Sequence, residues 1–315
     1  MNKEQSQFLE VSGVWKYIDG IAVLQGIDLI QGAHQNLGIA GETGSGKSSL
    51  LKIIAGLMEA DRGTVFFQNE RILGPNEKLI AGHKSIAYLS QHFELRNHYR
   101  VEELMEMAMQ VDPEIANRIF SLCQVEHLLK RRTDRLSGGE KQRIAIARLL
   151  ITFPKLLILD EPYSNLDHAH KNIMKSVLRS IDEELNISCI LVSHDPADLL
   201  SWADTIIVMK DGMIVQQAEP RMVYEQPINE YVATLFGKIN RISINNHEQL
   251  VRPEQLIIGN GHPSTLSGIV QSVKYYGSYY ELEIDSSGNM LTVRSAHGAF
   301  DIGQQVSLSL SPSKP

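Results

Sequence analysis

The residues at positions 41–48 have the composition and spacing of a phosphate-binding loop. They read Gly-Glu-Thr-Gly-Ser-Gly-Lys-Ser, which fits the pattern G-x-x-x-x-G-K-[ST]. Glycines let the backbone curl so that successive N–H groups point at one anion, with no Cβ atom in the way. Lys47 can reach the β- and γ-phosphates of a nucleotide, and the Ser48 hydroxyl can bind Mg²⁺. The residues predicted to contact the nucleotide here are Gly41, Glu42, Thr43, Gly44, Ser45, Gly46, Lys47, Ser48 and Ser49.

Two carboxylates, Asp160 and Glu161, directly follow an apolar run at 156–159. Acids that end a buried parallel strand lie at the edge of the sheet where such folds bind ligands. Asp160 is suited to holding Mg²⁺ through its water shell, and Glu161 to orienting and deprotonating an attacking water. A solvated strand end would explain two acids equally well. Their combination with a phosphate loop earlier in the chain favours phosphoryl transfer.

A second candidate anion site lies at 136–143, which reads Leu-Ser-Gly-Gly-Glu-Lys-Gln-Arg and precedes a predicted helix at 144–150. Ser137 is a residue type that caps helix N-termini, and Gly138 and Gly139 expose backbone N–H groups at the positive end of the helix. The alternative interpretation is an ordinary helix cap.

The elements around these motifs predict how they are positioned. Residues 37–40 read as a buried strand that enters the phosphate loop, and residues 49–55 as the helix that leaves it. Helices and buried strands then alternate, at 143–151 (helix), 156–160 (strand), 169–185 (helix) and 187–192 (strand). This alternation predicts an α/β fold, with a mostly parallel sheet flanked by helices.

Other segments predict smaller subdomains within the same fold. Strand-like runs at 8–11 and 23–30 surround a turn at Asp19-Gly20, and 64–68 is a further predicted strand. Helical periodicity predicts helices at 101–108 and 115–129. The methionines of this region are predicted to fill the core, namely Met105, Met107 and Met109.

The predicted secondary structure changes after Gly237, from alternating strands and helices to short strands alone. Residues 238–315 contain short alternating strands, at 267–273, 279–284 and 291–294, separated by Gly, Asn and Ser. This pattern predicts a small all-β barrel or sandwich, so we expect one domain at 1–237 and a second at 238–315. Four tyrosines of this region could stack on bases, but with few Lys or Arg beside them we expect them to pack the barrel: Tyr275, Tyr276, Tyr279 and Tyr280.

Bulk composition limits the class of protein. The chain has 315 residues, of which 43% are hydrophobic and 21% charged, so it is long enough for two globular domains. Its net charge of −7 argues against a broad nucleic-acid surface. Neither Cys123 nor Cys189 has metal-ligand spacing, and both are expected to be reduced. No apolar run approaches the length of a membrane span, and the N-terminus does not resemble a signal peptide, which predicts a soluble protein.

The octet at 136–143, together with the phosphate loop, resembles the signature sequence of ATP-binding-cassette (ABC) ATPases. Other motifs of that family are matched over residues 8–236 by Gln91 (Q-loop), Ser164-Asn165-Leu166-Asp167 (D-loop) and His194 (switch histidine). Glu140 stands where many importers carry Gln. The resemblance implies a P-loop NTPase core with antiparallel β and helical subdomains, and the cofactors ATP and Mg²⁺.

The resemblance also implies roles for individual residues. Catalysis would depend on Lys47, Glu161 and His194, and Mg²⁺ would be held by Ser48, Gln91 and Asp160. The adenine would stack on an aromatic side chain near the N-terminus. Counting back from residues 23–24 favours Tyr17, whereas another register would place Ile18 there, and Trp15 shares the strand face of Tyr17.

ABC ATPases act as head-to-tail pairs, so the resemblance implies a homodimer. The ATP on the phosphate loop of one subunit would then be completed by residues of the other: Ser137, Gly138, Gly139 and Asp167. Closure of such a pair would drive transmembrane permease subunits that are separate chains.

The C-terminal region resembles the transport-associated OB (TOBE-like) domain of bacterial importer ATPases, through residues 251–254 and 268–278. This implies a regulatory or dimerising domain, a solute-binding protein as a further partner, and a peripheral position on the cytoplasmic face of the inner membrane. We expect import of ferric ion, an inorganic oxyanion or a polyamine in preference to a sugar. One alternative is an exporter ATPase. Another is a non-transport ABC ATPase that acts on nucleic acid, but such proteins usually carry tandem cassettes, coiled-coil insertions or cysteine-rich zinc modules, which this sequence lacks.

Overall fold

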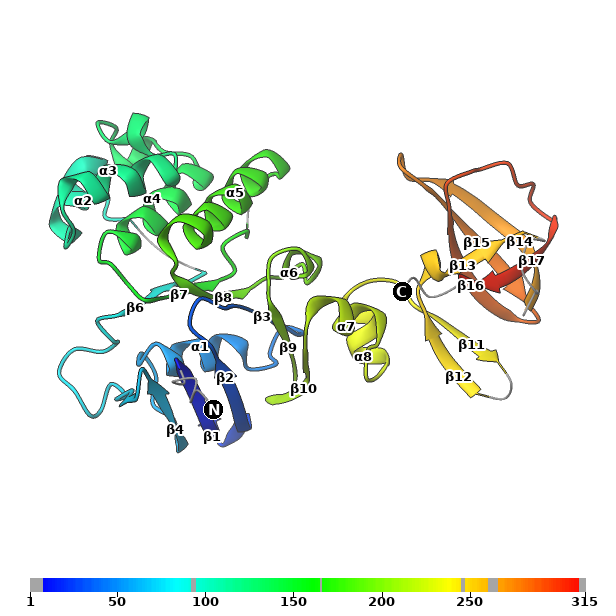
Figure 1. Ribbon diagram of the computed structural model, residues 1–315, viewed down its shortest axis with the longest axis horizontal. Helices are drawn as coiled ribbons and strands as arrows, with labels where there is room; N and C mark the ends of the chain where they lie inside the picture. Colours follow the sequence, from blue (N-terminus) through cyan, green and yellow to red (C-terminus); the bar gives the residue numbers. More distant parts are fainter. Residues whose placement is uncertain (1–7, 92–94, 165, 245–246, 260–265, 312–315) are drawn as a thin grey trace, which may run out of the picture. The chain divides into compact units, whose positions relative to one another are not determined.

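The computed structural model describes residues 8–91, 95–164, 166–244, 247–259 and 266–311 (Figure 1). They form two compact units, Met1–Val223 and Tyr224–Pro315. These units divide between Val223 and Tyr224, within the short helix α7 (Pro220–Glu225). The domain boundary expected at 237/238 stays a prediction.

A six-stranded sheet is the centre of the first unit. Its strands lie in the order β10 (Met213–Ala218), β9 (Thr205–Lys210), β3 (Asn36–Ala40), β8 (Ser188–Val192), β7 (Leu156–Asp160) and β6 (Ile86–Leu89). All neighbouring pairs are parallel except β9 and β10. Every residue of β3, β7 and β8 is buried, because both faces of a parallel sheet are covered and near-continuous apolar runs are therefore required. The predicted parallel sheet is confirmed.

An antiparallel sheet makes a second layer. Its strand order is β2 (Ile21–Gln31), β1 (Leu9–Ile18), β4 (Arg62–Phe67) and β5 (Glu70–Arg71), and the expected turn joins β1 to β2 at Asp19-Gly20. Helix α1 (Lys47–Ile54) lies between the two sheets (Figure 1). Side chains from both sheets and from α1 form one continuous core, which holds α1 against both sheets.

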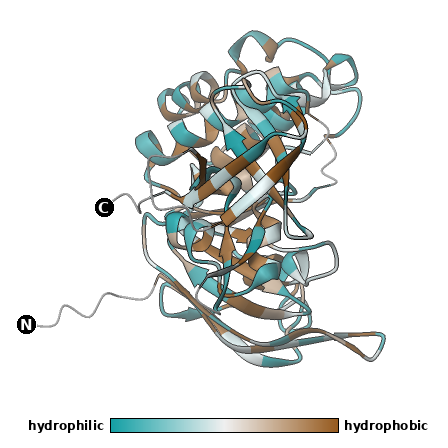
Figure 2. Ribbon diagram, turned by 90° about the vertical axis from the view of Figure 1, so that its right-hand side faces the viewer, coloured by the Kyte–Doolittle hydropathy of each residue, from teal (hydrophilic) through white to brown (hydrophobic). Residues whose placement is uncertain are grey.

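Helices cover the other face of the six-stranded sheet. They are α2 (Val101–Ala108), α3 (Pro113–Leu122), α4 (Gly138–Leu150) and α5 (His168–Leu185), with the short α6 (Ala197–Leu200) further along the chain. Figure 2 shows hydrophilic and hydrophobic residues side by side on the helices, as packing on one face requires. No helix in the described ranges is long and apolar enough to cross a membrane.

Two expectations for the helical region are wrong. The helix expected at 115–129 ends at Leu122, because Gln124 has a left-handed backbone (φ 54°) and only a 3₁₀ turn, Glu126–Leu128, follows. Met105 is 1% exposed but Met107 is 62% exposed. Residues two apart point to different sides of a helix, so these methionines cannot form one core stripe.

The second unit is built on a curled five-stranded antiparallel sheet (Figure 1). Its order is β13 (Leu256–Ile258), β17 (Gln305–Leu310), β14 (Leu266–Tyr275), β15 (Tyr280–Ser286) and β16 (Asn289–Ser295), and β11 (Asn240–Ile244) pairs with β12 (His247–Val251). One apolar cluster fills its interior, as an OB-like fold requires. Tyr275 and Tyr276 are 68% and 52% exposed, so the expectation that they pack the barrel is wrong.

A buried arginine ties the N-terminal part of the second unit to its sheet. Arg252, 1% exposed, donates hydrogen bonds to the carbonyl oxygens of Tyr224, Ala233, Gly237 and Lys238, at 2.7–3.3 Å. Its guanidinium also lies 4.2 Å from the centre of the Tyr224 ring. Ala233 belongs to α8 (Glu230–Leu235), so this one side chain satisfies carbonyl groups at and just beyond the end of that helix.

Arg252→Met is therefore expected to destabilise the second unit by about 3 kcal/mol or more, because it leaves several buried carbonyl oxygens without donors. Both tryptophans, Trp15 and Trp202, lie in the first unit, so their fluorescence reports only on that unit. In urea unfolding, the circular-dichroism transition should gain an early phase that tryptophan fluorescence does not show. The control is Arg241→Met, which removes an exposed arginine paired with Glu230 and should change little. An early phase of equal size in both variants would contradict the role of Arg252.

Candidate active site

Four adjacent strands deliver the predicted site residues to one edge of the sheet. In the order β3, β8, β7 and β6, the segments that follow the strands contain Gly41, His194, Glu161 and Gln91. Neighbouring parallel strands end at the same edge, so motifs far apart in sequence lie together there.

The phosphate loop has positive φ angles that favour glycine at Gly41, Gly44 and Gly46, and at two of these positions a side chain would also clash. Gly41 has φ 151° and Gly46 has φ 97°. A Cβ atom on Gly46 would lie 2.6 Å from the carbonyl oxygen of Val23, and one on Gly41 would overlap the carbonyl oxygen of Met209. Gly46 is also the N-cap of α1, so the loop passes directly into the helix as predicted.

Lys47 lies inside the curl of this loop. Its Nζ donates to the carbonyl oxygens of Gly41 and Glu42 at 2.7 Å each, and to Ser45 Oγ at 3.3 Å. Burial lowers the pKa of Lys47, an effect opposed by nearby carboxylates, of which Glu161 is the strongest. The ammonium group is thus held by neutral acceptors at the place where a phosphate would arrive.

A pocket of about 210 Å³ joins the loop to the strand ends. It is lined by Val23, Thr43, Gly44, Gly46, Lys47, Ser48, Ser49, Gln91, Glu161 and His194. Of the predicted residues outside the loop, Ser137, Gly138, Gly139, Asp167, Tyr17 and Asp160 do not line it, and within the loop Gly41, Glu42 and Ser45 do not line it either. The structure therefore brings the phosphate loop and the predicted catalytic groups together within one chain, and leaves the signature outside.

Glu161 has the environment of a general base. It is 7% exposed, and burial raises the pKa of its carboxyl group. His194 Nε2 contacts Glu161 Oε2, and Ser164 Oγ donates to the same oxygen at 3.1 Å. The backbone of Glu161 has φ 59° and is held by a hydrogen bond from its N–H to the Val192 carbonyl oxygen at 3.0 Å. Strained backbone of this kind persists where the surrounding structure fixes it, often in active sites.

Asp160 has one carboxylate oxygen engaged and one free. Tyr88 donates its hydroxyl to Asp160 Oδ2 at 2.9 Å, whereas the buried Oδ1 has no hydrogen-bond partner in the part of the chain that the structure describes. Burial, and then the Asp160 charge, raises the pKa of Tyr88, so its hydroxyl stays a donor. Mg²⁺ prefers oxygen ligands, and the residues here fit it. Asp160 has a buried carboxylate oxygen without a donor, and the exposed residue Ser48 and Gln91 line the nucleotide pocket.

The signature residues form the first turn of α4, which begins earlier than the predicted helix. Ser137 Oγ accepts from the N–H of Glu140 at 3.2 Å, and Glu140 Oε2 accepts from the N–H of Ser137 at 2.7 Å. This reciprocal capping box explains why a helix starts at a Ser-Gly-Gly sequence. Glu140, where many importers carry Gln, serves the box equally well and adds an ion pair to Arg131 at 2.9 Å.

His170 links the signature to the D-loop. Asp167 Oδ1 accepts hydrogen bonds from the backbone N–H and from Nδ1 of His170, both at 2.8 Å, and these bonds lower the pKa of Asp167. The other side of the ring covers Gly139, where an added Cβ would lie 2.6 Å from His170 Cδ2. Asn165 of the D-loop lies outside the described residues.

The aromatic candidates for the adenine lie beside each other. The rings of Trp15 and Tyr17 are nearly parallel, with centroids 6.2 Å apart, as expected for residues on one strand face. Tyr17 is 38% exposed and Ile18 is 40% exposed. Tyr17 stays our prediction for the stacking residue.

Sequence reasoning missed the contacts of Tyr88 and His170, and it matched Ser164 to the D-loop without expecting the hydrogen bond from Ser164 to Glu161. Tyr88 carried a usable signal, since a tyrosine in an apolar strand must find a partner for its hydroxyl. His170 carried none, because its contact with Gly139 depends on how two helices pack.

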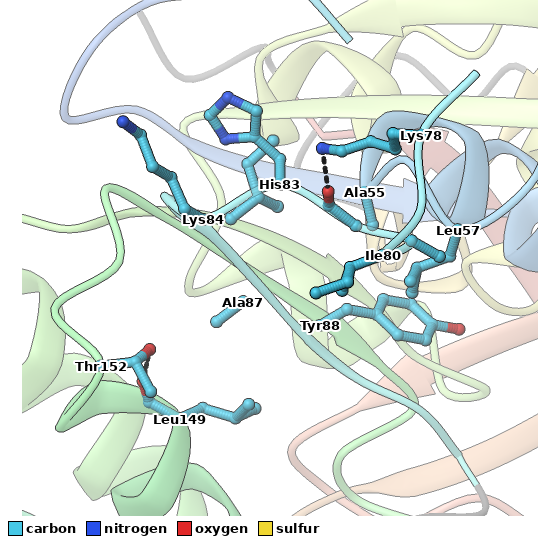
Figure 3. A pocket seen from close by; sticks show the side chains of 13 residues that line it. Ala55, Leu57, Lys78, Ile80, His83, Lys84, Ala87, Tyr88, Leu149 and Thr152 are labelled. Carbon is cyan, nitrogen blue, oxygen red and sulfur yellow. Dashed lines mark hydrogen bonds between the residues drawn. The ribbon is translucent and has the colours of Figure 1, made fainter. Parts of the chain in front are cut away.

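A second and larger groove, of about 490 Å³, lies on the same unit (Figure 3). Apolar side chains such as Leu57, Ile80 and Leu149 form much of its wall, with Lys78, His83 and Lys84 on one side. Lys78 Nζ donates to the Gly82 carbonyl oxygen at 2.6 Å. Tyr88 belongs to the wall as well, although the groove and the nucleotide pocket share no lining residue.

Comparison with known proteins agrees with this geometry. The family model described as ABC transporter matches residues 24–164, and the model described as TOBE domain matches residues 250–314. The sulfate/thiosulfate import ATP-binding protein CysA of Pseudomonas putida is 31% identical over 260 residues, 79% of this chain and 78% of that protein.

Two relatives match over almost their full length. The spermidine/putrescine import ATP-binding protein PotA of Clostridioides difficile is 29% identical, covering 96% of this chain and 95% of that one. The Fe(3+) ions import ATP-binding protein FbpC of Escherichia coli O157:H7 is 27% identical, covering 98% and 97%. Among solved structures, the dimeric ATP-binding cassette MJ0796 bound to ADP and Pi has a TM-score of 0.59 and 26% identity, covering 68% of this chain and 99% of that one.

The fold and the pocket define a P-loop ATPase with a signature helix. The chain belongs to the ATP-binding proteins of the ABC transporter family and carries a C-terminal TOBE domain. The predicted fold class, the resemblance and the ATPase activity are thereby confirmed.

The contact between His170 and Gly139 predicts a stability effect. Gly139→Ala should destabilise the chain by about 1–3 kcal/mol, because the new methyl group must displace the imidazole ring. Adding His170→Ala should recover most of the loss in thermal unfolding. The matched control is Gly138→Ala, since nothing lies within 4 Å of a Cβ at that position. Equal stability of the two single variants would contradict the packing described for His170.

Proposed function

We propose that this chain is the ATP-hydrolysing subunit of an importer, and that its solute is ferric ion, an inorganic oxyanion or a polyamine. The ATP-hydrolysing role is supported above all by one observation: Lys47, Glu161 and His194 line the same pocket. Import is favoured over export because the relatives carry import in their names. Those names also include sulfate/thiosulfate, spermidine/putrescine and Fe(3+) ions, which agrees with the solute classes expected from a single small C-terminal domain.

Hydrolysis in this site proceeds by in-line attack of water on the γ-phosphorus. Glu161 accepts the proton of the water while the bond from the γ-phosphorus to the bridging oxygen breaks, which gives ADP and phosphate. Lys47 exchanges its carbonyl partners for the β- and γ-phosphates, and His194 orients Glu161. Mg²⁺, held by Ser48, Gln91 and Asp160, would neutralise charge on the phosphates.

A head-to-tail homodimer completes the site. The signature lies outside the pocket of its own chain, so Ser137, Gly138, Gly139 and Asp167 act on the ATP of the partner subunit. The capping box engages the N–H groups of Ser137 and Glu140, so the N–H groups of Gly138 and Gly139 in the first turn of α4 would bind the γ-phosphate. Hydrolysis removes that contact. The second unit strengthens the pair and regulates it. The dimeric relative bound to ADP and Pi supports this arrangement.

The large groove receives a permease subunit. Its apolar wall and the adjoining loop, where Leu79 is 101% and Ile80 is 78% exposed, suit a short amphipathic helix. Lys84 on one side suits an acidic residue of that helix. We therefore place the chain on the cytoplasmic face of the inner membrane as a peripheral subunit, working with permease subunits and a solute-binding protein that are separate chains.

Glu161→Gln tests the catalytic assignment. The amide keeps the shape of the side chain but cannot accept a proton, so turnover should fall by about 10²–10⁴-fold. Binding of ATP should persist, and size-exclusion chromatography with ATP should show a lasting dimer. Turnover near the wild-type rate would rule out Glu161 as the base.

A mixture of two inactive variants tests whether each ATP site is shared between two subunits. Ser137→Arg and Lys47→Ala should each abolish ATPase activity, the first without weakening ATP binding to the isolated subunit. In a mixture, a dimer of one chain of each kind has one site with an intact loop and an intact signature, so part of the activity should return. A mixture as inactive as its components would indicate that each chain forms its site alone.

A further inference from the structure

We propose that Tyr88 is a positioning residue that fixes the Mg²⁺ ligand Asp160 and also forms part of the groove wall, so that an occupant of the groove acts on the metal site. The inference rests on the proposed function, because it takes Asp160 as a Mg²⁺ ligand. It adds a physical connection between two sites that share no lining residue.

Strand register places Tyr88 beside Asp160. In the parallel pair of β6 and β7, Tyr88 lies opposite Ile158, and Asp160 follows two residues later on the same face of the sheet. Side chains at such diagonal positions are within reach of a long aromatic residue. The Tyr88 hydroxyl closes the distance with its 2.9 Å hydrogen bond to Asp160 Oδ2.

This bond decides which oxygen of Asp160 is available. Asp160 is 4% exposed, so water cannot readily replace the phenol as a donor. With Oδ2 engaged, Oδ1 is the oxygen left for a cation. Hydrogen-bond partners of metal-ligating carboxylates orient the ligand, and their loss typically weakens metal affinity by about 10–100-fold.

The ring of the same tyrosine faces the groove. In Figure 3 it lies near Leu57 and Ile80, and the hydroxyl points away from Ala87, Leu149 and Thr152 across the groove. Tyr88 is half-buried, in contrast to the buried residues Ala87 and Leu89 on either side. A segment seated in the groove would therefore contact the ring, and any displacement of the ring moves the hydroxyl that holds Asp160.

The first experiment removes the hydroxyl and keeps the ring. Binding of a non-hydrolysable ATP analogue to the full chain is measured against Mg²⁺ concentration and in EDTA, for wild type and Tyr88→Phe. Mg²⁺ should enhance binding of the analogue, and the Mg²⁺ concentration that gives half of this enhancement should rise about tenfold in Y88F. The affinity for the analogue in EDTA should be unchanged. The matched control is Tyr224→Phe, which also removes a tyrosine hydroxyl that donates to a carboxylate, the exposed bond to Glu254 in the second unit, and it should leave the Mg²⁺ dependence unaltered.

Each result of this experiment is informative. If the Mg²⁺ dependence of Y88F equals that of wild type, the positioning role is wrong while the proposed function stands. If wild type itself shows no Mg²⁺ dependence, the metal assignment in the proposed function is wrong, and this inference falls with it.

The second experiment fills the groove with a chemical probe. Thr152→Cys, in the groove wall, is labelled with a bulky maleimide, and the unlabelled variant is the reference. Cys123 and Cys189 are buried, and burial raises the pKa of both thiols, that of Cys123 to about 12, so they do not compete for the label. Labelling should shift the Mg²⁺ concentration for half-maximal enhancement several-fold, and the shift should be absent when Y88F is added. No shift on labelling, or an equal shift with Y88F, would overturn the connection between groove and metal site.

Discussion

The meeting of four parallel strand ends at one edge of a sheet is the constraint on which the first unit depends. The strands β3, β8 and β7 are buried along their whole length, so sliding one of them by a residue would bury a charge or expose an aliphatic side chain. The ladder extends one residue past β7, through the N–H of Glu161 and the carbonyl oxygen of Val192. Apolar burial thereby sets the strand register, and with it the position of the Glu161 carboxylate at the end of β7.

Features set by local chemistry were predictable from the sequence. The phosphate loop is recognisable because Gly41, Gly46 and Lys47 together have the spacing that phosphate binding requires. The structure gives those two glycines backbone angles that other residues avoid. The buried strand before Asp160 and the cap at Ser137 are equally local, since each follows from the polarity or the hydrogen-bonding groups of a few consecutive residues.

Features set by packing between distant segments were not predictable. The bond from Tyr88 to Asp160 requires the register of two strands whose residues are far apart in sequence, and the position of His170 over Gly139 requires the packing of two helices. The early end of α3 depends on one left-handed residue, Gln124, that is not glycine. A periodic pattern specifies the face of an element, but neither its neighbours nor its last residue.

Arg252 has a consequence for how such chains can be recombined. Arg252 donates to carbonyl groups between Tyr224 and Lys238, so the helix α8 and the β-strands of the second unit depend on each other and should be exchanged together. The sequence pattern, in contrast, changes only after Gly237. A crossover between this gene and that of a relative preserves these bonds when it falls ahead of codon 224. A crossover between codons 238 and 252 brings together a helix and an arginine that did not evolve as partners, and the hybrid inherits whatever mismatch lies between them.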